Sequence, residues 1–92
     1  MTKLTSLDQL KVGSRLRIVG KSESDNYGSV SVKKIIICKR DNPSESWHEI
    51  LINRSKNYYF HFENYLSGKS QWVKEVYVLN GIDGRLKNKD FE

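Results

Sequence analysis

Short runs in which apolar and polar residues alternate recur along this 92-residue chain, and clusters of turn-forming residues separate them. In the first run, Leu16 and Ile18 alternate with Arg15 and Arg17, which is the period-two pattern of a half-buried β-strand. This rhythm of strands and turns leaves no room for a long helix. The same reasoning predicts five strands, over residues 14–19, 29–39, 47–52, 58–62 and 72–79.

The second of these strands contains an irregularity. Val30 and Val32 set one phase of the alternation, and Ile35 and Ile37 resume on the other phase. A β-bulge at residues 33–34 would explain this change of phase, and it would bend the strand as a small barrel requires.

Two single helical turns are expected between the strands and at the start of the chain. Ser6 can cap the first turn with Gln9 as its capping-box partner, and Gly13 permits a left-handed exit. Residues 63–68 are too few for a packed helix and suit a single 3-10 turn.

Five short strands with a 3-10 turn before the last one describe a mostly β fold, a single small SH3-like β-barrel. The rival is the oligonucleotide-binding barrel, which places a longer helix between its third and fourth strands, where this chain has only residues 54–57. We expect one domain over residues 1–92, with a polar, loose tail at residues 82–92. Residues 85–87 of that tail can add a short edge strand.

The charge of the chain narrows the class of partner. Sixteen Lys and Arg against eleven Asp and Glu give a formal net charge of +5. Such an excess favours nucleic acid, an anionic membrane surface or an acidic protein patch, although it can also serve solubility alone. The single cysteine cannot form an internal disulfide, and no segment approaches the roughly 18 apolar residues of a membrane span. We therefore expect a protein of the cytoplasm, without a membrane partner.

Catalysis is not expected. Cys38 ends an apolar run and is predicted to be buried and chemically quiet. Neither His48 nor His61 lies in a recognisable nucleophile setting, and a zinc site built from these three residues would lack a fourth ligand. The glutamates are scattered among basic residues, which favours ion pairs over an acid–base pair. We expect no cofactor and no bound metal.

Two segments resemble known families. Residues 10–18, Leu-Lys-Val-Gly-Ser-Arg-Leu-Arg-Ile, resemble the first strand of SH3-like and KOW-type barrels, in which a glycine precedes a charged and apolar alternation. Residues 59–74, with the sequence YFHFENYLSGKSQWVK, are similar to small early proteins of T-even-type tailed phages. The second resemblance implies a host-takeover or defence-countering role in the host cytoplasm, exercised by binding, and it names no catalytic residue.

Nucleic acid is the first partner that the basic residues predict. Arg and Lys supply salt-dependent phosphate contacts, and an exposed aromatic ring offers a stacking surface for unpaired bases. No motif separates DNA from RNA. The candidate nucleic-acid-binding residues are Arg15, Arg17, Lys33, Lys34, Lys39, Arg40, Arg54, Lys56 and Tyr59. Simple alternation also leaves three further aromatic residues outside the core, Tyr27, Trp47 and Tyr77.

Protein binding is the alternative function, as a small inhibitor or adaptor of a host or cellular protein with an acidic surface. The segment from Lys69 to Trp72 follows the predicted 3-10 turn, and Trp72 with Tyr65 could anchor an interface, because Trp, Tyr and Arg dominate binding hot spots. The competing interpretation is that Trp72 closes one end of the barrel. The sequence leaves the oligomeric state open.

Overall fold

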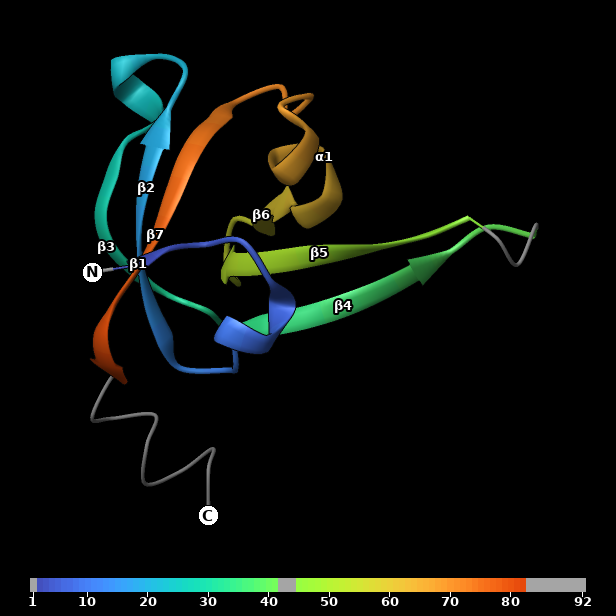
Figure 1. Cartoon of the computed structure of the whole chain (residues 1–92), viewed down its shortest axis with the longest axis horizontal. Helices are drawn as coiled ribbons and strands as arrows, with labels where there is room; N and C mark the ends of the chain where they lie inside the picture. Colours follow the sequence, from blue (N-terminus) through green and yellow to red (C-terminus); the bar gives the residue numbers. More distant parts are fainter. Residues whose placement is uncertain (1, 42–44, 83–92) are drawn as a thin grey trace.

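The structure, a computed structural model, describes residues 2–41 and 45–82 and is mostly β (Figure 1). The predicted mostly β fold without a long helix is confirmed, since the longest described helix has six residues. The edge strand predicted at residues 85–87 and the tail from residue 83 lie outside the described residues. In chain order the elements are β1 (Thr2–Lys3), η1 (Leu7–Gln9), β2 (Ser14–Gly20), η2 (Glu23–Asp25), β3 (Tyr27–Ser31), β4 (Lys34–Lys39), β5 (Ser46–Asn53), β6 (Tyr58–His61), α1 (Phe62–Ser67) and β7 (Val73–Ile82).

The strands form two antiparallel sheets. The four-stranded sheet has the order β1-β7-β2-β3, and the three-stranded sheet has the order β4-β5-β6. The predicted count of about five strands is wrong, because the described residues form seven. No ladder among these strands joins the two sheets into a closed barrel. In Figure 1 the four-stranded sheet stands upright, and β4 and β5 extend sideways from it as a two-stranded arm.

The chain passes from one sheet to the other at a single peptide bond. The N–H of Val32 donates to the carbonyl of Ser14 in β2, at 2.8 Å, whereas the N–H of Lys33 donates to the carbonyl of Leu51 in β5, at 2.7 Å. The change of phase seen in the sequence is therefore a crossing between sheets and not a bulge within one strand, and the strand predicted over residues 29–39 is two strands. Val32 is fully buried at the crossing and fills the core.

The core lies between the two sheets and α1. Leu16 and Ile18 of β2, Val76 of β7, Ile50 of β5 and Phe60 of β6 are at most 1% exposed and belong to one apolar cluster. Fully burying a side chain of this kind stabilises the fold by about 1.5–3 kcal/mol. The alternation predicted for the first strand is confirmed by this burial.

The predicted cap of the first helical turn is confirmed. Ser6 Oγ accepts a hydrogen bond from the N–H of Asp8, at 3.3 Å, and Gln9 Oε1 accepts one from the N–H of Ser6, at 3.0 Å. Gly13 follows with a φ of 94°, in the left-handed region that favours glycine. Leu10 is buried beside this turn.

The 3-10 turn predicted at residues 63–68 is instead the α-helix α1, and this helix is packed. Phe62 and Tyr65 lie one turn apart and are both buried, so even a six-residue helix contributes to the core. The Tyr65 hydroxyl donates to the carbonyl of Leu4, at 2.5 Å. Tyr65 is therefore a core residue and not the interface anchor that the sequence predicted. Gly68 ends the helix with a φ of 77°.

Cys38 is half-buried, which corrects the prediction of a buried thiol. It is the last residue but one of β4, and its neighbour Ile37 is 62% exposed. The three isoleucines of this run predict a core strand. Only Ile35 among them packs against the core cluster.

Candidate functional site

An open polar hollow of about 500 Å³ lies where the four-stranded sheet meets the turn between β5 and β6. Three predicted site residues from separate segments line it: Arg15 on β2, Lys33 at the crossing between the sheets, and Arg54 in the turn. Serine side chains, among them Ser29 and Ser55, also line it, and none of the lining residues is Asp or Glu. We call this site the basic hollow.

The strand pairing of β2 with β3 holds Arg15 in place. Arg15 donates to Ser29 Oγ from Nε, at 3.0 Å, and from Nη2, at 2.6 Å. A guanidinium carries five N–H donors, so this contact fixes the side chain and leaves donors for a ligand.

Arg54 is held by the geometry of its turn. Asn53 Oδ1 accepts a hydrogen bond from the N–H of Lys56, at 3.2 Å, and Asn57 closes the turn with a φ of 50°. Asn suits both positions because its short amide bonds the local backbone and tolerates the left-handed region. Arg54 Nη2 then donates to the carbonyl of Lys33, at 3.2 Å, and thereby ties the turn to the sheet crossing.

The positive charge of the basic hollow is not neutralised by a carboxylate of the described residues. Among the described residues, the ion pair between permanently charged groups lies elsewhere and joins Arg40 to Glu45, at 3.6 Å, whereas the Glu63 carboxylate is engaged by His48. Cations gathered in this way repel one another and produce a local positive potential.

A second basic feature adjoins the hollow on the outer face of the four-stranded sheet. In the strand register Lys3 of β1 is opposite Tyr77 of β7, and Tyr77 is opposite Arg17 of β2. We call these three residues the tyrosine row. Arg15 lies two residues from Arg17 on the same face, so the row continues into the basic hollow. Lys3 was missed in the sequence because the two residues of β1 are too few to show alternation.

The Tyr77 ring is held in position by its hydroxyl, which donates to Glu75 Oε2 at 2.5 Å. The pKa of Tyr77 is raised, first by this hydrogen bond, then by burial and by the charge of Glu75. The charge of Arg17 acts in the opposite direction, which shows that the guanidinium lies close to the phenol. The phenol therefore stays neutral, with a cation on each neighbouring strand.

The structure does not bring the other predicted cations to this surface. Lys34 and Lys39 begin and end β4, and Arg40 follows at the far end of the arm. Lys56 is exposed in the β5–β6 turn but does not line the basic hollow. The sequence placed these residues together by charge alone. β4 carries Lys39 and Arg40 away along the arm, whereas Lys34 and Lys56 adjoin the hollow in sequence without lining it.

Another hollow, of about 760 Å³, lies on the outer face of the three-stranded sheet and contains Tyr59, which is 39% exposed. We call it the aromatic hollow. Three carboxylates line it, and these would repel phosphate groups, so Tyr59 does not extend the basic hollow. The aromatic rings and carboxylates of its lining are Trp47, Tyr59, His61, Trp72, Glu45, Glu49 and Glu63.

Both tryptophans of this hollow are engaged by their neighbours. Arg40 Cζ and the His61 ring each lie 5.8 Å from the centre of the Trp47 ring. Arg40 follows β4 and His61 ends β6, so the two residues approach Trp47 of β5 from its two neighbouring strands. Trp72 is half-buried, with its ring 4.8 Å from that of Tyr58, and it packs against the core. Trp72 thus helps to close one end of the fold, while its neighbour in the predicted interface, Lys69, is exposed.

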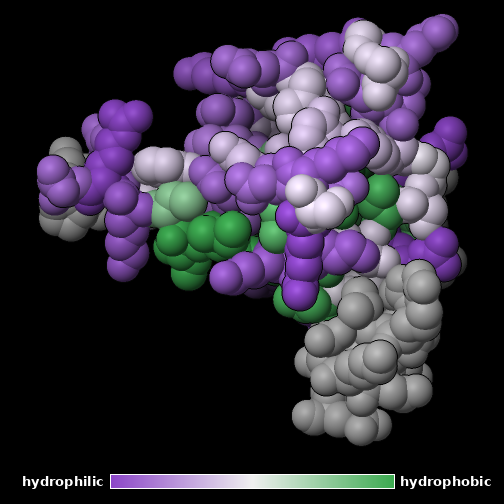
Figure 2. Space-filling model, turned by 180° about the vertical axis from the view of Figure 1, so that it is seen from behind, coloured by the Kyte–Doolittle hydropathy of each residue, from purple (hydrophilic) through white to green (hydrophobic). Residues whose placement is uncertain are grey.

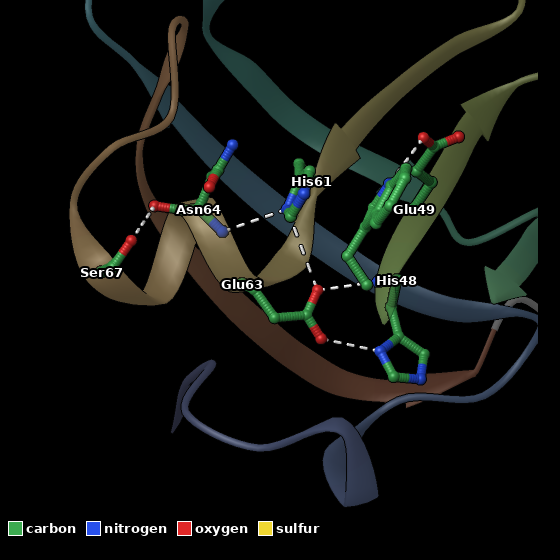
Figure 3. Close-up of polar contacts among 7 residues, drawn as sticks. His48, Glu49, His61, Glu63, Asn64 and Ser67 are labelled. Atoms are coloured by element: carbon green, nitrogen blue, oxygen red, sulfur yellow. Dashed lines mark hydrogen bonds and ion pairs between the residues drawn. The ribbon is translucent and has the colours of Figure 1, made fainter. Parts of the chain in front are cut away.

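A polar network at the wall of the aromatic hollow joins β5, β6 and α1 (Figure 3). Glu63 accepts hydrogen bonds from the backbone N–H of His48 and from its ring Nδ1, both at 2.7 Å. His61 Nδ1 accepts from the N–H of Asn64, at 3.1 Å, and so caps α1. Burial would raise the pKa of Glu63, but its hydrogen bonds, chiefly those from His48, outweigh it and lower the pKa.

The described contacts of these groups stabilise the fold. Burial, together with a hydrogen bond to Glu49 and the charge of Glu49, raises the pKa of the Cys38 thiol, which disfavours the nucleophilic thiolate. Neither histidine ring contacts a hydroxyl or thiol among the described hydrogen bonds. Residues 2–41 and 45–82 contain no group of three His, Cys, Asp or Glu residues that could hold a metal ion.

No family model, curated protein or solved structure matches this chain. The helices of the described residues are also too short and too polar to cross a membrane.

Proposed function

We propose that the protein binds nucleic acid, without base specificity and without catalysis, through the basic hollow and the tyrosine row. The observation that supports this is the gathering of Arg15, Lys33 and Arg54 from three segments around one hollow whose lining contains serine hydroxyls and no carboxylate. A polyanion relieves the repulsion among these cations and releases its own counterions.

The chemistry of the surface suits a single strand. Guanidinium forks and serine hydroxyls bind phosphate oxygens, and such contacts carry no sequence information. Tyr77, between Lys3 and Arg17, offers a stacking surface for an unpaired base, and the two cations that flank it outnumber the one carboxylate that its hydroxyl contacts, that of Glu75. A strand that leaves the tyrosine row past Arg15 enters the basic hollow.

The test is a titration with single-stranded and duplex DNA and RNA as the salt concentration rises from about 50 mM. We expect the double variant R15E/R54E to bind more weakly, and the slope of log affinity against log salt to fall by about one per lost phosphate contact. The matched control is K39E/K69E, which changes the net charge equally at exposed lysines outside the hollow, and it should keep most of the slope. Equal losses in both double variants would reduce the effect to net charge and contradict the proposal.

Tyr77→Ala separates stacking from charge. We expect it to weaken single-strand binding by about 1–3 kcal/mol per stacked base and to leave the salt slope nearly unchanged. A loss of the same size for duplex and single strand would contradict the stacking role of Tyr77.

Two finer predictions accompany this proposal. The SH3-like barrel stays a prediction, since the described strands form two sheets without a closing ladder. The host-takeover role implied by the similarity of residues 59–74 to phage early proteins also stays a prediction. Both the fold and the role are compatible with a protein that binds its partner and catalyses no reaction.

Binding of another protein is the second candidate function. The observation that favours it is the exposed apolar edge of β4, where Ile37 is 62% exposed on a strand that pairs on one side only within the described residues.

A further inference from the structure

β4 is the edge strand of the three-stranded sheet, and only β5 pairs with it among the described strands. Within the described part of the chain, the backbone of residues 34–39 makes no hydrogen bond outside this ladder. An antiparallel edge strand directs every second pair of N–H and C=O groups outward. Such a row of unpaired groups is a template on which another strand can add.

The side chains of this edge are apolar over four successive residues. Ile35 packs against the core and anchors the strand, Ile36 and Cys38 are half-buried, and Ile37 is 62% exposed. In Figure 2, where the arm points to the left, hydrophobic surface gathers where the arm leaves the body of the molecule. An exposed apolar edge without proline or a central charge favours strand pairing.

Lys34 and Lys39 lie at the two ends of β4, and they make a second copy of this chain a poor occupant. In a symmetric antiparallel pair that aligns all six residues, Lys34 of each copy faces Lys39 of the other. Like charges directly opposite across strands are destabilising. A strand with a carboxylate at each of these positions would instead form two attractive pairs.

We propose that the β4 edge binds an extended segment of a partner protein that carries an acidic residue at each end of an apolar and polar alternation. Lys34 and Lys39 are five positions apart, so their side chains point to opposite faces of the sheet. The two acidic residues must have the same separation. This site shares no residue with the basic hollow or the tyrosine row, and it goes beyond the nucleic-acid function.

The probe is a blocked peptide with the core Glu-Val-Thr-Val-Thr-Glu, and the comparison peptide has Lys at both ends. Each is titrated into the isotope-labelled full chain, with amide shifts and amide hydrogen exchange measured by NMR. We expect the Glu-ended peptide to protect outward amides of residues 34–39. It should bind about tenfold more tightly than the Lys-ended peptide, because two cross-strand pairs change from repulsive to attractive.

The variant K34E/K39E should reverse this preference, whereas the control K21E/K69E, at two exposed lysines elsewhere, should retain it. A reversed preference is gained binding, so loss of folding cannot produce it. Equal affinity for the two peptides, protection of amides outside residues 34–39, or no binding of either peptide would overturn the proposal.

Sedimentation of the protein alone tests whether a second copy of the chain occupies the β4 edge. We expect the wild type to stay monomeric and the single variant K34E to self-associate, because a carboxylate then faces Lys39 twice across a symmetric pair. If the wild type itself dimerises with protection of the β4 amides, a second copy is the occupant and the proposal is wrong. Peptide binding that survives in R15E/R54E would show that the β4 edge acts independently of the proposed nucleic-acid site.

Discussion

The carboxylate of Glu63 links the start of α1 to β5, since both of its oxygens accept hydrogen bonds from His48. Although burial acts in the opposite direction, these bonds lower the pKa of Glu63 from its ordinary value of 4.5. A carboxyl whose pKa is lower in the folded chain than in the unfolded chain stabilises the fold above the unfolded pKa. That stabilisation is lost as the pH falls through the folded value.

We therefore expect Glu63→Gln to flatten the pH dependence of stability. Between about pH 5.5 and about pH 3, the free energy of unfolding should fall more steeply in the wild type than in this variant. Urea denaturation at several pH values measures this. Glu23→Gln is the control, because Glu23 is exposed and makes no ion pair within the described residues, and it should follow the wild type. Parallel curves for Glu63→Gln and the wild type would contradict the role of the His48 hydrogen bonds.

At the scale of elements, the stability of α1 depends on the backbone conformation at its C-terminus as well as on the side chains that it buries. Gly68 terminates the helix in the left-handed region, and its N–H donates to the carbonyl of Tyr65, at 3.2 Å. A Cβ at this position would meet nothing within 4 Å, so the cost of a larger residue is confined to the backbone.

Gly68→Ala should lower the free energy of unfolding by about 1–2 kcal/mol through this backbone strain alone. Gly28→Ala is the matched control: Gly28 lies in β3, a Cβ there also meets nothing within 4 Å, and its φ is not in the left-handed region. Chemical denaturation compares the two variants. The same loss of unfolding free energy in both variants would contradict the role given to the positive φ of Gly68.

The elements that the sequence predicted well are those whose alternation is unbroken. β2 is recognisable because the inward-facing Leu16 and Ile18 alternate with two arginines, and the cap at Ser6 is recognisable because its partners are local. The crossing at Lys33 could not be predicted in the same way. A change of phase looks identical whether the strand bulges or passes to another sheet, and only the distant pairing with Leu51 decides.

The candidate site was predictable only in part for the same reason. Charge identified Arg15, Lys33 and Arg54, but it also selected Lys39 and Arg40, which the crossing carries away along the arm. The remaining member of the surface, Lys3, becomes visible only when β1 pairs with β7. Net charge therefore predicted the kind of surface, whereas the register of the sheets determined its members.

At the scale of the whole molecule, the net charge of +5 is unevenly distributed. The basic hollow has no carboxylate among its lining residues, whereas the aromatic hollow has three. Polyanions should therefore bind the folded chain at the basic hollow and stabilise it by mass action.

We expect heparin to raise the Tm of the wild type. At a hundredfold excess over its Kd, heparin should raise the free energy of unfolding by about 2.7 kcal/mol. The increase should be much smaller in R15E/R54E and nearly complete in K39E/K69E. Thermal unfolding with and without heparin measures it. An equal increase in the two double variants would show that heparin recognises net charge and not the basic hollow.

The position of β7 in the sheet also determines when the tyrosine row can form during synthesis of the chain. β7 is the last described strand of the chain, yet it lies between β1 and β2. The ribosome releases the N-terminal part first, at about 5–20 residues per second. A nascent chain that ends before residue 73 therefore carries Lys3 and Arg17 on strands that are not neighbours, with an empty place between them. The tyrosine row is therefore complete only once β7 has taken its place between β1 and β2, whereas every residue that lines the basic hollow has been synthesised before β7 begins.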